Sequence, residues 1–240
     1  MKADIDSLKM ITDAFSDLDK NAIERLVFLE NTRQLNIESA LGKTLKYLPE
    51  KVSEKEVDDD WRSRYFNKIQ DISNDDLQEI WARILAGEIE EPGTVSLRTL
   101  DLLSNLSKYE AEKFQLACSM VSKQSHIYMI KSYELFDRLG LSYNDFKLLD
   151  EAGLIFLGNN AKYKLELKDN VGEMNIGDKI YRLTYSKANT IVSSYKFTAT
   201  PLTTSGIELC KLINPITNEN YRDHFCKLIE SNFFKIELRG

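Results

Sequence analysis

The sequence has few residues of the types that build metal, disulfide or nucleophilic sites. Of its 240 residues, 3 are cysteine and 2 are histidine, and no two cysteines form a CxxC motif. Neither His126 nor His224 has a cysteine or carboxylate at the spacing of a zinc site. Glycine-rich phosphate loops and the GxSxG and HExxH motifs are also missing. We therefore expect no cofactor, and no residue pattern points to a particular reaction.

Long apolar runs are also missing from the sequence. No run approaches the ~20 residues of a membrane-spanning helix, and residues 1–20 carry charges throughout, unlike a signal peptide. Two of the cysteines, Cys118 and Cys210, fall within apolar helical patterns, which predicts buried free thiols in a reducing compartment. We expect a cytoplasmic protein with no membrane partner.

The charge of the chain is acidic and unevenly distributed. The net charge of −6 and the pI of about 5.2 argue against nucleic-acid binding by the surface as a whole. Residues 1–123 contain 17 basic and 24 acidic residues, whereas residues 124–240 contain 15 and 14. This change in charge predicts two domains with different surfaces, divided between residues 123 and 124.

The stretch from Ser73 to Leu106 predicts two helices joined by a tight acidic turn. Ser73 and Asp76 resemble a capping box at the start of the first helix, and Gly87 is placed to end it in a left-handed cap. Pro92 and Gly93 form a turn dipeptide, and Ser96 can cap the second helix. One interpretation is a buried helical hairpin with a solvated turn. The other is a binding surface formed by Glu88, Glu90, Glu91 and Arg98.

This stretch also carries a family resemblance. The pattern consists of a Trp-Ala pair, Leu-Ala-Gly-Glu, Pro-Gly, Ser-x-Arg-Thr-Leu, Leu-Ser and a Glu-Ala pair. Its positions here are Trp81, Ala82, Leu85, Ala86, Gly87, Glu88, Pro92, Gly93, Ser96, Arg98, Thr99, Leu100, Leu106, Ser107, Glu110 and Ala111. The pattern resembles the hallmark of an uncharacterised bacterial family, a domain of unknown function, over about half of the chain. It has a fainter similarity to bacterial abortive-infection alpha proteins, which implies a role in defence against phage.

Helical spacing of apolar residues continues on both sides of this stretch. It predicts a helix over residues 4–18 and a second from Asn21 to Pro49, with a weak pattern between Glu30 and Asn36. The N-terminal helix could pack within the molecule or serve self-association. A capping box at Ser107 and Glu110 begins a further helix. The residues expected in the core are Trp61, Phe66, Trp81, Leu85 and Leu100.

The second half of the chain changes its period. Short helices that end near Gly140 and Gly153 precede β-prone runs at residues 162–168, 179–185 and 191–200. Two further helices and a last strand follow these runs. Helix, turn, helix and hairpin in this order resemble a winged-helix domain. The predicted fold is therefore mainly α, with an N-terminal helical domain followed by an α+β winged-helix-like domain.

Three classes of function remain open at this point. The first is a non-catalytic interaction or sensor protein in phage defence, with a protein partner or a second copy of itself. The second is a nucleic-acid-binding regulator that uses a basic wing at residues 160–196, where tyrosines alternate with charges. The candidate contacts in that wing are Lys162, Lys164, Lys168, Lys179 and Arg182. The third is an enzyme with a carboxylate in an interdomain cleft.

Overall fold

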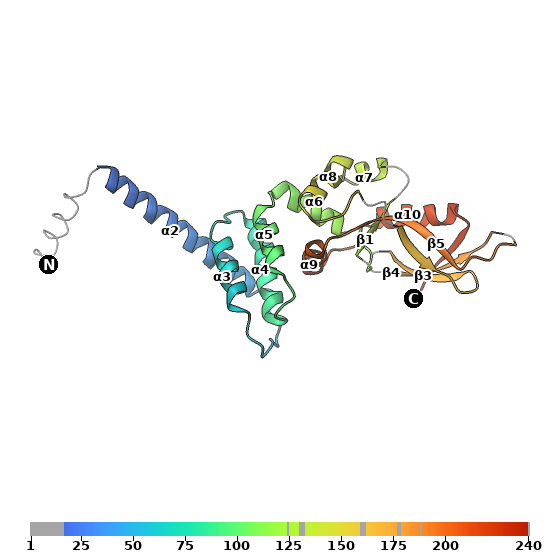
Figure 1. Ribbon diagram of the computed structural model, residues 1–240, viewed down its shortest axis with the longest axis horizontal. Coiled ribbons are helices and arrows are strands. Elements are labelled where there is room, and N and C mark those ends of the chain that lie inside the picture. The colour runs from blue at the N-terminus through green and yellow to red at the C-terminus, as the bar shows by residue number, and fades with distance from the viewer. Residues whose placement is uncertain are drawn as a thin grey trace, which may run out of the picture.

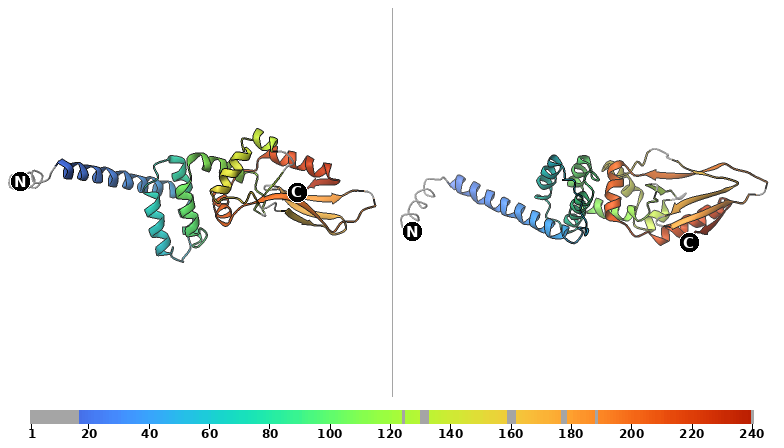
Figure 2. Two further views of the ribbon diagram at one scale, coloured as in Figure 1. Left: turned by 45° about the horizontal axis from the view of Figure 1, so that its top comes forward. Right: turned by 90° about the horizontal axis from the view of Figure 1, so that it is seen from below.

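The computed structural model describes residues 17–123, 125–129, 133–158, 162–176, 179–187 and 189–239. The first half of the chain forms helices α2 (Asp17–Thr44), α3 (Asp59–Ile69), α4 (Asp75–Glu90), α5 (Leu97–Asn105) and α6 (Lys108–Cys118). Helix α2 projects from the body, and α3, α4 and α5 gather at its C-terminal end (Figure 1, Figure 2). The helix expected over residues 4–18 lies, apart from its last two residues, outside the described residues.

Helix α2 is continuous across the region where its apolar pattern weakens. This is where the helix passes from solvent onto the body of the molecule. Arg33 Nε donates to Asp71 Oδ1 at 2.8 Å, and Asn36 Nδ2 donates to the carbonyl of Gln70 at 2.8 Å. The weak pattern therefore marks a change in the surroundings of α2 and not an interruption of the helix.

Short-range capping signals fix the starts of the following helices. Ser96 Oγ accepts from the backbone N–H of Thr99 at the start of α5, and Ser107 forms a full capping box with Glu110 at the start of α6. At the start of α4 the cap is Asn74 and not Ser73, because the Asn74 side chain accepts from the N–H of Leu77.

The prediction that Gly87 ends α4 is wrong, because this helix continues to Glu90. Gly87 lies where α4 crosses α9 (Thr204–Ile213), and a Cβ at this position would lie 2.7 Å from Leu212 Cδ2. The missing side chain therefore allows two helices to approach closely. Gly93, with φ of +98°, does lie in the expected turn after the helix.

The second half combines short helices with two sheets. Strand β1 (His126–Tyr128) is followed by α7 (Glu134–Arg138) and α8 (Tyr143–Glu151). The remaining elements are β2 (Lys162–Glu166), β3 (Val171–Ile176), β4 (Lys179–Tyr185), β5 (Ser194–Pro201), α9, α10 (Glu219–Ser231) and β6 (Phe234–Leu238). The strands form two antiparallel sheets of three strands, in the orders β1-β5-β2 and β3-β4-β6. Strand β3 was not expected from the sequence.

Buried side chains form two clusters. The larger includes residues from both halves of the chain, from Ala40 on α2 to Tyr221 on α10. Of the residues expected in the core, Trp61, Leu85, Trp81 and Leu100 are buried and Phe66 is partly buried. The smaller cluster lies among the sheets and α10 and includes Tyr128 and Phe225, whose rings stack at 4.8 Å. The division of the chain between residues 123 and 124 stays a prediction.

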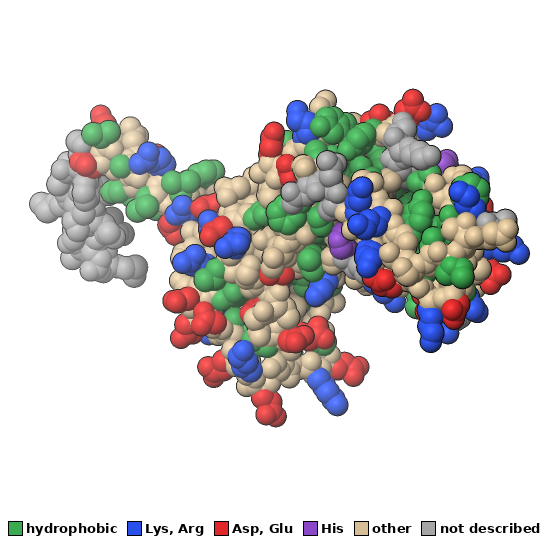
Figure 3. Space-filling model, turned by 45° about the vertical axis from the view of Figure 1, so that its right-hand side comes forward, with side chains coloured by type: hydrophobic (Ala, Val, Ile, Leu, Met, Phe, Trp, Pro, Cys, Tyr) green, Lys and Arg blue, Asp and Glu red, His purple; other side chains and the backbone are tan. Residues whose placement is uncertain are grey.

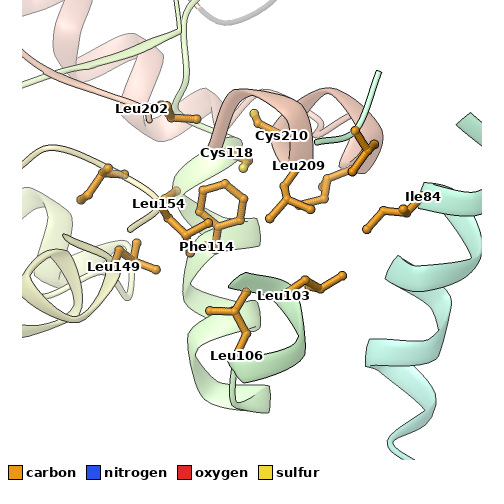
Figure 4. Packing of buried hydrophobic residues seen from close by; sticks show 14 of the residues in the cluster. Ile84, Leu103, Leu106, Phe114, Cys118, Leu149, Leu154, Leu202, Leu209 and Cys210 are labelled. Atoms are coloured by element: carbon orange, nitrogen blue, oxygen red, sulfur yellow. The ribbon is translucent and has the colours of Figure 1, made fainter. Parts of the chain in front are cut away.

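Two of the three cysteines lie side by side in the larger cluster. Cys118 on α6 and Cys210 on α9 point toward one another (Figure 4), and both are buried free thiols, as expected. Burial raises the pKa of the Cys118 thiol well above its usual value. A hydrogen bond from Cys118 lowers the pKa of Cys210.

A buried carboxylate joins α6 to α8. Asp145 accepts from Tyr109 Oη at 2.6 Å and from the N–H of Ser142 at 2.7 Å, and Lys113 Nζ lies 3.6 Å away. Burial raises the pKa of Asp145, but these hydrogen bonds and the charge of Lys113 outweigh it, so the pKa lies below its usual value.

The fold as a whole mixes helices with two small antiparallel sheets.

Candidate functional site

The acidic turn after α4 is organised by a carboxylate that points inward. Glu88 is 1% exposed. Its carboxylate accepts from the N–H of Gly93 at 2.6 Å, the N–H of Val95 at 3.1 Å and the hydroxyl of Thr94 at 3.3 Å. A carboxylate that binds three donors of its own loop fixes the path of that loop. This burial removes Glu88 from the contact surface predicted from the sequence.

A second carboxylate holds the other end of the same loop. Glu208 on α9 accepts from the N–H of Ser96 at 2.8 Å and from the hydroxyl of Thr99 at 2.6 Å. It therefore lies at the N-terminus of α5, where the exposed N–H groups and the helix dipole favour negative charge. Sequence reasoning missed Glu208, because the contact joins positions more than 100 residues apart. Much of the hallmark pattern thus serves to build the α4–α5 hairpin.

The other three residues of the predicted contact surface are exposed but do not form one site. Arg98 lines a shallow hollow of about 380 Å³ with Asp101, Glu110 and Glu151. Among the described residues, the guanidinium of Arg98 has no hydrogen-bond or ion-pair partner. Glu90 lines a different hollow, which contains Arg83 and Lys211. Glu91 is exposed at the C-terminal end of α4.

The predicted basic wing is divided between the two sheets. Lys162 and Lys164 lie on β2, where Lys164 pairs in register with Lys196 of β5 and forms an ion pair with Glu166 at 2.6 Å. Lys179 and Arg182 belong to β4 in the other sheet.

Acidic residues reduce the positive charge of the second sheet. Arg182 lies in register between Glu173 and Glu237 on the neighbouring strands. Lys168 is exposed at an isolated bridge with Val171. The five predicted basic residues therefore do not form one continuous surface.

The tyrosines of the wing do not share a surface with the lysines. Successive residues of a strand point to opposite faces, so Tyr163 and Tyr195 lie on the faces opposite Lys164 and Lys196. Tyr163 packs edge-on against Tyr128 at 5.4 Å, and Tyr195 contacts Phe197 at 4.9 Å. These rings belong to the smaller cluster. The alternation of tyrosine and charge along the sequence therefore does not produce a base-stacking platform.

The most conspicuous exposed surface lies on α2. Every residue from 17 to 31 is exposed, and this part of the helix stands clear of the body. Its large apolar side chains include Leu18 (77% exposed), Leu26 (60%) and Phe28 (69%), with Ile23, Val27 and Leu29 also exposed. Figure 3 shows hydrophobic side chains along the projecting helix. Large exposed apolar surfaces of this kind mark interaction sites.

Arg83 borders a cavity of about 350 Å³ that is lined by residues of α4 and α6 and by Ile213 of α9. Its guanidinium donates to the carbonyl of Ile213 at 3.1 Å and covers the ring of Tyr47 at 4.9 Å.

Within the described ranges, no three His, Cys, Asp or Glu side chains are placed to hold a metal ion. None of the described helices is long and apolar enough to cross a bilayer.

Comparison with known proteins places the chain in a family. No curated protein and no solved structure matches it. The family model described as "Protein of unknown function (DUF2806)" matches residues 20–226, which contain the α4–α5 hairpin, both carboxylates that hold it and every strand except β6. The chain therefore belongs to the DUF2806 family.

Proposed function

We propose that the protein is a non-catalytic, cytoplasmic interaction protein of bacteria that acts in defence against phage, with residues 17–31 of α2 as its interaction surface. The observation that carries the proposal is this exposed stretch of helix, in which large apolar side chains lie free of the body. Most of the stability of helices in proteins comes from packing of an apolar face, so a partner that covers the apolar side chains of this exposed stretch would stabilise it.

The link to phage defence comes from the hallmark of the α4–α5 hairpin. Trp81, Leu85, Leu106 and Ser107 belong to the part of the pattern that resembles abortive-infection alpha proteins. In the structure these residues stabilise the body from which α2 projects: Trp81, Leu85 and Leu106 are buried, and Ser107 caps α6. The hallmark accordingly supports a shared scaffold, and α2 supplies the contact.

Expression of the protein in a bacterium challenged with a broad phage panel tests this function. We expect fewer plaques on cells that express the wild type than on cells with the empty vector. Cells that express the double variant Leu26→Glu and Leu29→Glu should give as many plaques as cells with the empty vector. The matched control is Asn21→Glu with Asn31→Glu, which adds the same charges at exposed positions of the same segment. The control should protect as the wild type does. Equal plaque counts with wild type and empty vector for every phage would contradict the proposal.

A second candidate function is nucleic-acid binding by the second half of the chain. Supporting it, α7 and α8 lie between β1 and β2 in the chain, and β5 pairs with both of these strands, an order of elements that resembles a winged-helix domain. Lys164 and Lys196 are paired in register on β2 and β5, and a bound anion would stabilise these like charges in competition with the ion pair between Lys164 and Glu166. Against it, α8 exposes Asp150 and Glu151 beside Lys147.

Fluorescence polarisation with labelled oligonucleotides, measured over a range of salt concentrations, tests this candidate. Binding should weaken steeply with salt, and Lys164→Gln with Lys196→Gln should reduce the slope of log K against log salt by about 2. A slope unchanged by the substitutions, or no binding at low salt, would rule out this face as the contact.

A further inference from the structure

The apolar side chains of α2 continue a face that is already packed against the body. In the C-terminal half of α2, Asn36, Ala40 and Thr44 are buried at intervals of four residues. With 3.6 residues per turn, stepping back from Asn36 along the same face reaches Arg33, and then Leu29, Leu26, Ala22 and Leu18. We call these last four residues the α2 stripe. The stripe has the same orientation as the packed face but no covering helix among the described residues.

The exposed apolar side chains of this segment favour a specific contact. Six large apolar side chains between residues 18 and 29 are each at least 42% exposed, and monomers rarely leave contiguous apolar patches of more than a few hundred Å² uncovered. Leu18, Leu26 and Leu29 lie on the stripe, whereas Ile23, Val27 and Phe28 lie on other sides of the helix, because successive residues are about 100° apart. The three leucines therefore form the apolar centre of a contact along the stripe, and the side chains that flank the stripe form its rim.

The charges of the segment bear on what covers it. Asp17, Asp19, Glu24 and Glu30 outnumber Lys20 and Arg25, so the segment is net acidic. Helices that lie on anionic lipid surfaces carry an excess of Lys and Arg on their polar face, which disfavours a membrane as the occupant. A helix of equal length with an apolar stripe of its own fits better, and the small Ala22 within the stripe allows a second backbone to come close.

We infer that the α2 stripe is covered by the α2 stripe of a second copy of this chain. The inference rests on the proposed function, since it names the partner for that surface. Two α2 helices pair side by side along residues 18–29, and each stripe replaces the cover that the body gives to residues 36–44. Apolar area is then removed from water on both copies at once.

Light scattering coupled to size exclusion tests the inference with purified full-length protein. We expect a mass of at least twice the 27.7 kDa of one chain. Leu26→Glu with Leu29→Glu should reduce the mass to that of one chain, and Asn21→Glu with Asn31→Glu should leave it unchanged. A wild-type monomer at high concentration, or a stripe variant that keeps the wild-type mass, would overturn the inference.

Hydrogen exchange on the wild type provides a second test that does not depend on any variant folding. Backbone amides of residues 18–29 should exchange at least tenfold more slowly at high than at low protein concentration, whereas amides of α4 should not change. Concentration-independent exchange in this segment overturns the inference. Binding of a monomer to vesicles of anionic lipid, lost in the stripe variant, overturns it in favour of a membrane surface.

These outcomes separate the inference from the proposed function. An oligomer that depends on the stripe but gives no phage resistance leaves the inference standing and overturns the function. Phage resistance conferred by a monomeric protein overturns the inference and leaves the proposed function standing.

Discussion

Replacing Glu88 with alanine should lower the free energy of unfolding by about 2–4 kcal/mol, because the substitution removes the acceptor for two backbone N–H groups. The N–H of Gly93 can turn to water, since Gly93 is exposed, but Val95 is 2% exposed and its N–H has no access to solvent. The loss also reaches the core. Val95 O accepts from Trp61 Nε1 at 2.8 Å, so the loop held by Glu88 positions the indole of α3. Urea unfolding followed by circular dichroism measures the change.

The matched control for this prediction is Glu91→Ala in the same turn. Glu91 is exposed, and its carboxylate makes no hydrogen bond or ion pair within the described part of the chain. Its substitution should therefore change the free energy of unfolding by no more than about 0.5 kcal/mol. Glu88→Gln should fall between the two, because the amide keeps one acceptor oxygen but loses the charge. If Glu88→Ala unfolds at the same urea concentration as Glu91→Ala, the buried carboxylate does not hold the loop.

Local signals in the sequence were sufficient to predict most of the helices. Caps such as Ser96 and Ser107 and stripes such as that of Trp81 and Leu85 depend on residues within one or two turns, so a linear reading finds them. The turns at Gly93, Gly140 and Gly153 were predicted for the same reason, and all three glycines have positive φ.

Contacts between distant parts of the chain were not predictable in this way. Gly87 has the sequence context of a helix end, but Leu212 of α9 passes beside it, and close helix packing gives a different reason for a glycine. Glu208 is one of many surface-type carboxylates until the fold brings it to the N-terminus of α5. Strand β3 contains Gly172 and Asn175, which favour turns locally, and it is stabilised by its pairing with β4.

In the candidate sites, too, the contacts between separate segments could not be predicted from the sequence. Glu88 follows Ile84 and Leu85 on the buried face of α4, but its sequence surroundings do not show that Gly93, Thr94 and Val95 donate to it, because these contacts depend on the path of the loop. For the predicted helix from Asn21 to Pro49, the sequence indicated apolar positions but not which of them the body covers. In the structure, residues 36–44 of α2 pack on the body and residues 17–31 are exposed. The choice between packing and self-association concerned the helix over residues 4–18, most of which lies outside the described residues.

Gly206→Ala should be the most damaging of the glycine substitutions, with a loss of about 4 kcal/mol or more, or failure to fold. Gly206 is buried near the start of α9, and a Cβ at this position would lie 2.1 Å from the carbonyl oxygen of Leu154 and 3.1 Å from its carbon. These are backbone atoms, so no side-chain rotation relieves the overlap, and α9 must move.

That movement would disturb several contacts together, because α9 carries Glu208 to the loop and Leu209 and Cys210 into the core. Gly42→Ala is the matched control: it lies in α2 with no atom within 4 Å of the added Cβ, and the better helix propensity of alanine should stabilise the protein by about 0.5–1 kcal/mol. Gly87→Ala should fall between them, because its Cβ meets the end of the flexible Leu212 side chain. Thermal unfolding of the three variants gives the order directly, and a Gly206→Ala protein as stable as Gly42→Ala would show that α9 does not approach Leu154 as described.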